Sequence, residues 1–117
     1  MSGWPGPTFG NGTKLDGDGV AKWLRAPISG DLLELPQCGP ACVGHFRDNG
    51  ISTTYGLFGK FLSLKEEGVG SVELCDRFYY WLGSIGIPPG SKGTITHAVA
   101  VKLEIHFPGI YDGDAYR

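Results

Sequence analysis

The residues best suited to bind a ligand lie in the run LPQCGPAC, at positions 35–42. Gly39 can adopt the positive φ that a tight turn between two helices requires. Pro40 suits the first position of the following helix, because its missing N–H costs nothing there. The first backbone N–H groups of such a helix point outward and attract an anion such as a DNA phosphate. The run therefore predicts a helix-hairpin-helix turn with a phosphate-binding end.

Two cysteines and a histidine in the same region have a spacing that raises the question of a metal. Cys38, Cys42 and His45 would share one face of a helix. A structural zinc site needs four ligands, however, and the chain has no C-x-x-C pair. Cys38 also falls where a hairpin needs an apolar side chain. We therefore expect these residues to pack in the core and to bind no metal.

The sequence carries no recognisable catalytic pattern. No Ser/His/Asp, Cys/His or paired-carboxylate arrangement stands out. The adjacent acidic pair Glu66 and Glu67 reads as a solvated loop. We therefore expect neither an enzyme nor a bound cofactor.

Composition limits the remaining function classes. The chain has 117 residues, 41% hydrophobic and 19% charged, which suits one packed domain. Its net charge of -2 gives no bulk attraction to nucleic acid, so a DNA site must be local. Its cysteine count of 3 is odd and indicates free thiols. Since we find no secretory signal and no apolar run of spanning length, we expect an intracellular protein, nuclear or cytoplasmic or both, without membrane insertion.

Turn residues divide the chain into short helical segments. Residues 1–19 are rich in Gly and Pro and predict a flexible tail, and residues 113–117 predict a polar one. Between them we expect one domain over residues 20–112. Ser71 is the expected N-cap of the helix over residues 72–82. The segments expected to be helical are 20–26, a short piece from Leu32, 40–49, 55–64 and 72–82.

The last element is ambiguous from its pattern alone. Over residues 97–107, apolar and polar residues alternate as in a strand. The same stretch also reads as a helix that begins at Thr94, with Ile95, Ala98 and Leu103 on one face. A lone strand would have no partner in so helical a chain, so we favour the helix. The predicted fold is therefore all-α.

The spacing of several short segments carries a resemblance to a known family. The segments are Ala26-Pro27-Ile28, the hairpin, Asn49-Gly50-Ile51 and Gly59-Lys60-Phe61-Leu62, with Trp81 downstream. Together they resemble the barrier-to-autointegration factor family of DNA-bridging proteins. The resemblance implies a compact, SAM-like bundle of about five helices with a helix-hairpin-helix motif. It also implies a symmetric homodimer, with an interface formed by Tyr55, Phe58, Gly59, Phe61 and Leu62.

The same resemblance implies a chromatin-associated protein that binds and bridges double-stranded DNA without sequence preference. Gln37, His45 and Thr94 stand where the family has glycine, lysine and arginine. We therefore expect weaker binding than in a typical member, because each lost cation neutralises one phosphate fewer. The expected DNA-binding residues are Gln37, Gly39, Ala41, Cys42, His45, Lys22 and Lys92.

Two further interpretations stay open. In the first, the chain is a dimeric protein-protein interaction module that kept the fold and lost DNA binding. Because the family also binds nuclear-envelope proteins, a nuclear-envelope or chromatin protein is then the expected partner. In the second, the chain is a hairpin subunit of a repair or replication assembly. The local charge around the hairpin distinguishes these interpretations.

Overall fold

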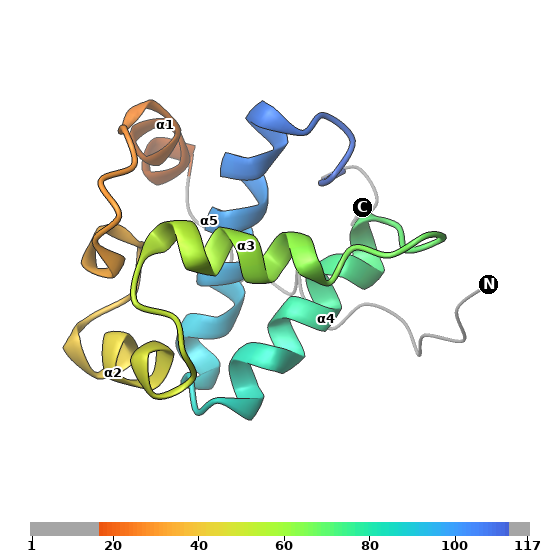
Figure 1. Cartoon of the computed structure of the whole chain (residues 1–117). Helices are drawn as coiled ribbons and strands as arrows, with labels where there is room; N and C mark the ends of the chain where they lie inside the picture. Colours follow the sequence, from red (N-terminus) through yellow and green to blue (C-terminus); the bar gives the residue numbers. More distant parts are fainter. Residues whose placement is uncertain (1–16, 113–117) are drawn as a thin grey trace.

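The computed structural model describes residues 17–112, and over that range the fold is all-α, as predicted (Figure 1). The predicted tails fall outside the described residues, except that residues 17–19 already belong to the first helix. The described part contains five α-helices and one short 3-10 helix, η1. Their bounds are α1 Gly17–Arg25, η1 Leu32–Glu34, α2 Pro40–Asp48, α3 Thr54–Ser63, α4 Ser71–Ser84 and α5 Pro89–His106.

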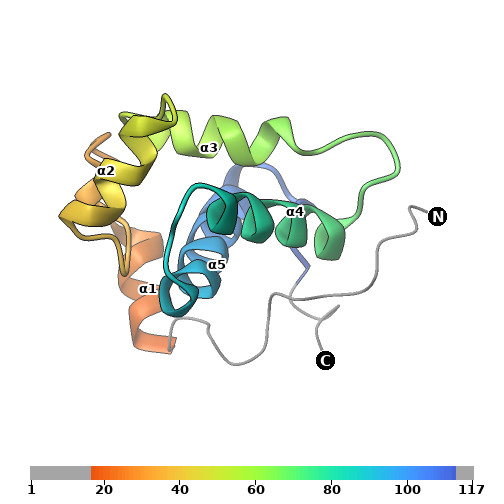
Figure 2. The same ribbon diagram turned by 90° about the horizontal axis from the view of Figure 1, so that it is seen from below.

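Helix α5 lies at the centre of the fold. Figure 2 shows α1 and α4 next to it, and Figure 1 shows α3 crossing its face. Residues 93–100 are all buried, so α5 has no continuous polar side. That burial explains why its sequence suited a strand as well as a helix. The helical interpretation is confirmed, and α5 begins earlier than expected, at Pro89, because proline is favoured in a first turn.

The N-terminal caps of α3 and α4 differ in kind. In α3 the cap is Thr53, whose Oγ1 accepts a hydrogen bond from the Gly56 amide at 3.0 Å. In α4 the cap is Gly70, so the expectation of a Ser71 cap is wrong. The Ser71 hydroxyl instead accepts a hydrogen bond from the Asp112 amide at 2.8 Å. It therefore ties the segment after α5 back to the start of α4.

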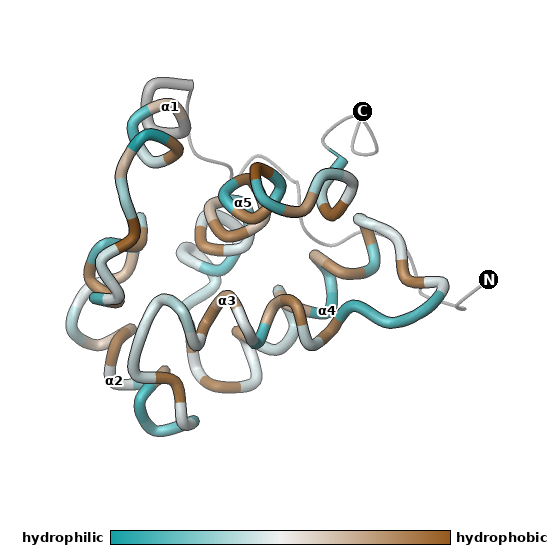
Figure 3. The backbone as a smooth tube through the Cα atoms, turned by 45° about the horizontal axis from the view of Figure 1, so that its top comes forward, coloured by the Kyte–Doolittle hydropathy of each residue, from teal (hydrophilic) through white to brown (hydrophobic). Residues whose placement is uncertain are grey.

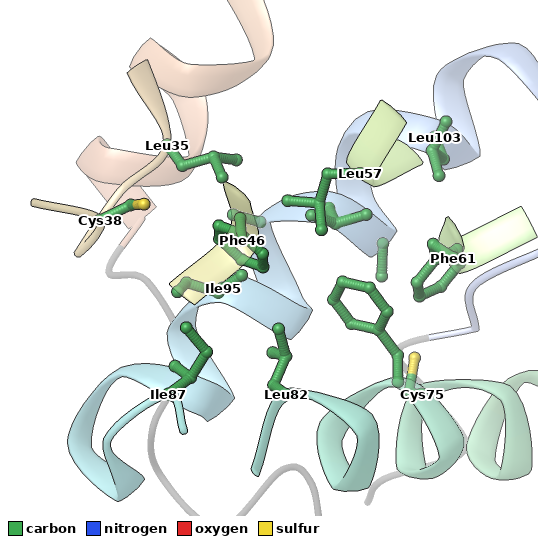
Figure 4. Packing of buried hydrophobic residues seen from close by; sticks show 14 of the residues in the cluster. Leu35, Cys38, Phe46, Leu57, Phe61, Cys75, Leu82, Ile87, Ile95 and Leu103 are labelled. Carbon is green, nitrogen blue, oxygen red and sulfur yellow. The ribbon is translucent and has the colours of Figure 1, made fainter. Parts of the chain in front are cut away.

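Aromatic side chains join α2, α3 and α4 in the core. Phe46, Phe61 and Phe78 have no exposed surface. The rings of Phe61 and Phe78 meet edge to face with centroids 5.1 Å apart, and those of Phe46 and Trp81 stack at 6.1 Å. Burial of each phenylalanine stabilises the fold by about 1.5 to 3 kcal/mol. Figure 4 shows the core side chains of these helices and of α5 turned toward one interior.

The connection between α3 and α4 begins with a hydrophilic, exposed stretch over residues 65–67 (Figure 3), and its Val69 is buried in the core. Arg77 of α4 holds it through Glu66, at 3.0 Å, and also pairs with Glu73 at 2.7 Å. The first of these pairs lies at the surface, where solvent screens the attraction between the two charges. Between residues 17 and 112, no helix is both long enough and apolar enough to cross a bilayer.

Candidate nucleic-acid interface

A tight turn joins η1 to α2, and its strained residue is not the one expected. Gln37 has the left-handed conformation, at φ +64°, whereas Gly39 is extended, at φ −96°. The expectation that Gly39 supplies the positive φ is therefore wrong. The left-handed region costs a residue with a Cβ about 1 to 2 kcal/mol. The turn is closed by the Cys38 amide, which donates to the Leu35 carbonyl oxygen at 3.2 Å.

The N-terminus of α2 is open to solvent. Gly39 is its N-cap and makes no side-chain capping hydrogen bond, and Gly39, Pro40 and Ala41 are all exposed. The Val43 amide donates to the Gly39 carbonyl oxygen at 3.0 Å, which begins the hydrogen-bond ladder of the helix. The amides of Ala41 and Cys42 precede that ladder, so they point out of the helix end. A Cβ at Gly39 would meet no atom within 4 Å, so a ligand can approach the backbone closely.

Glu34 fixes the entrance to the turn. Its carboxylate accepts hydrogen bonds from the Ser29 amide at 2.9 Å, the Gly30 amide at 3.0 Å and the Thr54 hydroxyl at 2.5 Å. Burial opposes ionisation of this carboxyl, but the Thr54 hydroxyl and the two amides outweigh it and lower the pKa of Glu34. The ionised side chain thus joins η1 to the first turn of α3.

The two hairpin cysteines are buried and face each other. Cys38 and Cys42 are 7% and 6% exposed, and their Sγ atoms lie 2.7 Å apart. Figure 4 shows the Cys38 sulfur turned toward the core, where an apolar side chain was expected. The hydrogen bond from the Cys38 thiol to Cys42 raises the pKa of Cys38 and lowers that of Cys42. Among residues 17–112, no three His, Cys, Asp or Glu side chains gather as metal ligands would. At this site Cys42 offers a phosphate its backbone amide, and the residue as a whole is only 6% exposed.

His45 of α2 and Lys92 of α5 both pack against the C-terminal end of α4 and the residues just after it. The His45 ring packs on Gly86, where a Cβ would lie 3.0 Å from its Cε1 and Nδ1 atoms. The Lys92 Nζ lies 4.5 Å from the ring centroid of Tyr79, and a Cβ at Gly83 would be 3.1 Å from it. Both side chains are half-buried. The structure therefore brings these two basic residues to one connection beside α2, with the Lys92 ammonium directed at α4.

Lys22 lies in a different part of the fold. It is exposed on α1, which is attached to α5 by its neighbour Trp23, whose Nε1 donates to the Ala98 carbonyl oxygen at 2.7 Å. Lys92 lies six residues before Ala98, which is about 9 Å along a helix axis. The part of α1 that contains Lys22 is therefore attached to α5 about two turns away from Lys92.

A second surface lies along α3 and consists mainly of apolar side chains. A groove of about 530 Å³ runs between the end of α1, the start of α3 and the end of α5. Tyr55 is 59% exposed beside it, and its hydroxyl donates to the Ile28 carbonyl oxygen at 2.9 Å. Phe58 also lines the groove. Gly59 is exposed, and a Cβ there would meet no atom within 4 Å, so a second helix can approach closely.

The remaining residues expected on this surface do not all face outward. Leu62 is half-buried, whereas Phe61 has no exposed surface and packs against Phe78. A side chain without exposed surface cannot contact a second copy, so Phe61 belongs to the core rather than to an interface. It supports α3 from beneath.

Sequence reasoning missed the part of this surface that α5 supplies. Ile105 is 53% exposed and lines the groove with Ile28 and Phe58. The helical interpretation of the last element could have predicted this exposure, because Ile105 does not lie on the helix face formed by Ile95, Ala98 and Leu103. An apolar residue left outside the core face of a helix indicates an exposed contact surface.

Comparisons with family models, with curated proteins and with solved structures give no significant match to this chain.

Proposed function

We propose that this chain binds the phosphate backbone of double-stranded DNA without sequence preference, through the N-terminus of α2. The observation that carries the proposal is the exposed, uncapped first turn of that helix. A phosphate oxygen can reach the amides of Ala41 and Cys42, and the helix dipole favours its negative charge. Contacts of this kind read no base, so no sequence preference follows. The resemblance of the hairpin and the Gly59 segment to the barrier-to-autointegration factor family supports the same function.

Two copies pair through the α3 surface, and one dimer then bridges two duplexes. Support comes from the open space at Gly59 and from the apolar groove beside Tyr55 and Phe58. The groove follows the C-terminal half of α5, whereas His45 of α2 packs on Gly86, in the connection that precedes α5. Bridging requires that the two hairpins of the pair remain free to bind separate duplexes.

The charge distribution predicts modest affinity. The whole chain carries a net charge of -2, and the Lys92 ammonium lies over the Tyr79 ring. Because few cations lie close to the hairpin, log K should fall only gently with log salt.

A titration with short duplex DNA, followed by fluorescence anisotropy at low and at moderate salt, tests the proposal. We expect micromolar binding at low salt, a steady loss with added salt, and equal affinity for unrelated sequences. Binding that depends on sequence, or no binding at low salt, contradicts the proposal.

Gly39→Glu identifies the contact. The substitution is allowed by an extended backbone and by the open space at this cap, so the fold stays intact. A carboxylate at the helix end repels phosphate, and affinity should fall at least about tenfold. The matched control is Gly70→Glu, since Gly70 is also an extended N-cap with no atom within 4 Å of its Cβ position. Equal losses in both variants would mean that only net charge matters.

A dimeric protein-protein interaction module is the second candidate function. Two exposed apolar side chains that line the groove favour it, namely Tyr55 at 59% and Ile105 at 53% exposed. Exposed clusters of this kind mark contact surfaces. If the wild-type protein dimerises but does not bind DNA at low salt, the result supports this second function and contradicts the first.

A further inference from the structure

The thiols of Cys38 and Cys42 are positioned to react with each other. Their Sγ atoms are 2.7 Å apart, and a disulfide bond measures about 2.05 Å, so a small side-chain rotation joins them. Both residues belong to one short segment: Cys38 lies just before the N-cap of α2, and Cys42 lies in the first turn of that helix. We propose that Cys38 and Cys42 form a reversible intrachain disulfide and make this hairpin a peroxide-reactive site. The inference does not depend on DNA binding.

The two cysteines have different roles because they occupy different positions. Cys42 lies in the first turn of α2, where the partial positive charge of the helix end favours a thiolate. The Cys38 thiol precedes the N-cap and donates its hydrogen bond to Cys42. Cys42 is therefore the nucleophile and Cys38 the resolving thiol.

The reaction needs hydrogen peroxide or a similarly small hydroperoxide as oxidant. The Cys42 thiolate attacks one peroxide oxygen, the O–O bond breaks, and the leaving hydroxide takes the proton lost by Cys42, which gives a sulfenic acid and water. The Cys38 sulfur then attacks the Cys42 sulfur, and the sulfenic hydroxyl leaves with the Cys38 proton as a second water. In sum, two thiols lose two hydrogen atoms and one peroxide becomes two waters. Exchange with two equivalents of a thiol such as glutathione reverses the step.

Exposure to solvent distinguishes Cys38 and Cys42 from the third cysteine. Cys38 and Cys42 keep 7% and 6% exposure next to the exposed Gly39, enough for a small oxidant. Cys75 has no exposed surface and lies in the core on α4. Oxidation of the folded protein should therefore spare Cys75.

The test is oxidation of the reduced full-length chain with stoichiometric hydrogen peroxide, followed by alkylation of the unfolded protein and mass spectrometry. We expect the intact mass to fall by two hydrogen atoms before alkylation, the single peptide that contains Cys38 and Cys42 to carry that loss, and only Cys75 to be alkylated. Treatment with dithiothreitol should restore all three thiols. If all three are alkylated after peroxide, or if the linked pair includes Cys75, the proposal is wrong.

Serine variants test the two roles and provide the control. In Cys38→Ser, a dimedone probe should trap a sulfenic acid at Cys42, and in Cys42→Ser the remaining Cys38 should react about tenfold more slowly. Cys75→Ser should form the disulfide as the wild type does. The reverse order of reactivity would overturn the assignment of the nucleophile. The wild-type measurement needs no substitution, so it decides the main point even if a variant fails to fold.

Discussion

The ammonium of Lys102, on α5, donates to the Trp23 carbonyl oxygen at 2.6 Å and lies 4.7 Å from the centre of the Trp23 indole ring. It also donates to the Ala26 carbonyl oxygen. These carbonyls belong to the end of α1, where a helix has no partners of its own for its last acceptors. Lys102 is buried, and burial lowers its pKa. One cation therefore caps α1 and attaches it to the central helix.

Lys102→Met should detach the end of α1. Methionine keeps the apolar stem, but the Ala26 carbonyl oxygen loses the Lys102 donor and the Trp23 carbonyl oxygen keeps only the Ala26 amide, at 3.3 Å. We expect the free energy of unfolding to fall by about 1 to 3 kcal/mol in urea titrations. Hydrogen exchange should rise in α1 before it rises in the other helices. Lys22→Met, at an exposed position of the same helix, is the control and should change stability by less than about 0.5 kcal/mol. A stable variant with protected α1 amides would show that packing of Trp23 alone holds the helix.

Glu34→Gln should remove part of the acid sensitivity of the fold. Because the pKa of Glu34 is lowered in the folded state, the unfolded chain binds more protons as the pH falls below 4.5. The stability that the carboxylate contributes is therefore present above that pH and is lost as the pH falls through the folded-state pKa. At pH 7 the variant should be less stable by about 1.5 to 3 kcal/mol, the range for hydrogen bonds to a charged group.

Urea unfolding between pH 7 and pH 3 measures this effect. The difference between wild type and Glu34→Gln should shrink across the acid range. Glu67→Gln, in an exposed loop, serves as the control and should track the wild type. A difference that is constant with pH would mean that the Glu34 carboxylate is not the titrating group.

The α3 segment shows how far local signals reach. Its predicted range, residues 55–64, differs from Thr54–Ser63 by one residue at each end, because capping and turn residues are local. Which side of α3 faces outward was less predictable. Phe58 and Phe61 are three residues apart and share a helical face, and only the position of Phe78 on another helix decides that Phe61 is buried.

The candidate site shows where local reasoning fails. A glycine was the natural choice for the left-handed residue of the hairpin, yet closure of the turn puts Gln37 in that conformation. The Gln37 conformation is set within the turn, where the Cys38 amide donates to the Leu35 carbonyl oxygen at 3.2 Å. The Lys92 ammonium lies over Tyr79 of α4, a contact between distant segments that sequence patterns do not encode.

Gln37→Gly should stabilise the protein. Glycine removes the cost of the left-handed backbone but adds freedom to the unfolded chain, so the net gain is about 0.5 to 1 kcal/mol. The reverse change provides the control: Gly50 has φ +83° with no atom within 4 Å of its Cβ position, so Gly50→Gln should lose about 1 kcal/mol. Urea denaturation of the three proteins measures both effects. A loss of stability in Gln37→Gly would mean that the Gln37 side chain holds the turn.

Gly59→Glu should separate the proposed dimer. A Cβ at Gly59 meets no atom within 4 Å in the single chain, so the substitution leaves each subunit folded. At a close helix contact, however, two carboxylates face each other across the two-fold axis, and the dissociation constant should rise at least about a hundredfold. Sedimentation velocity at matched concentrations measures the change, and circular dichroism checks the fold. Gly44→Glu is the matched control, because Gly44 is a helical glycine of α2 with equally open space. If Gly59→Glu remains a dimer, or if Gly44→Glu dissociates as well, the subunits pair through a surface other than α3.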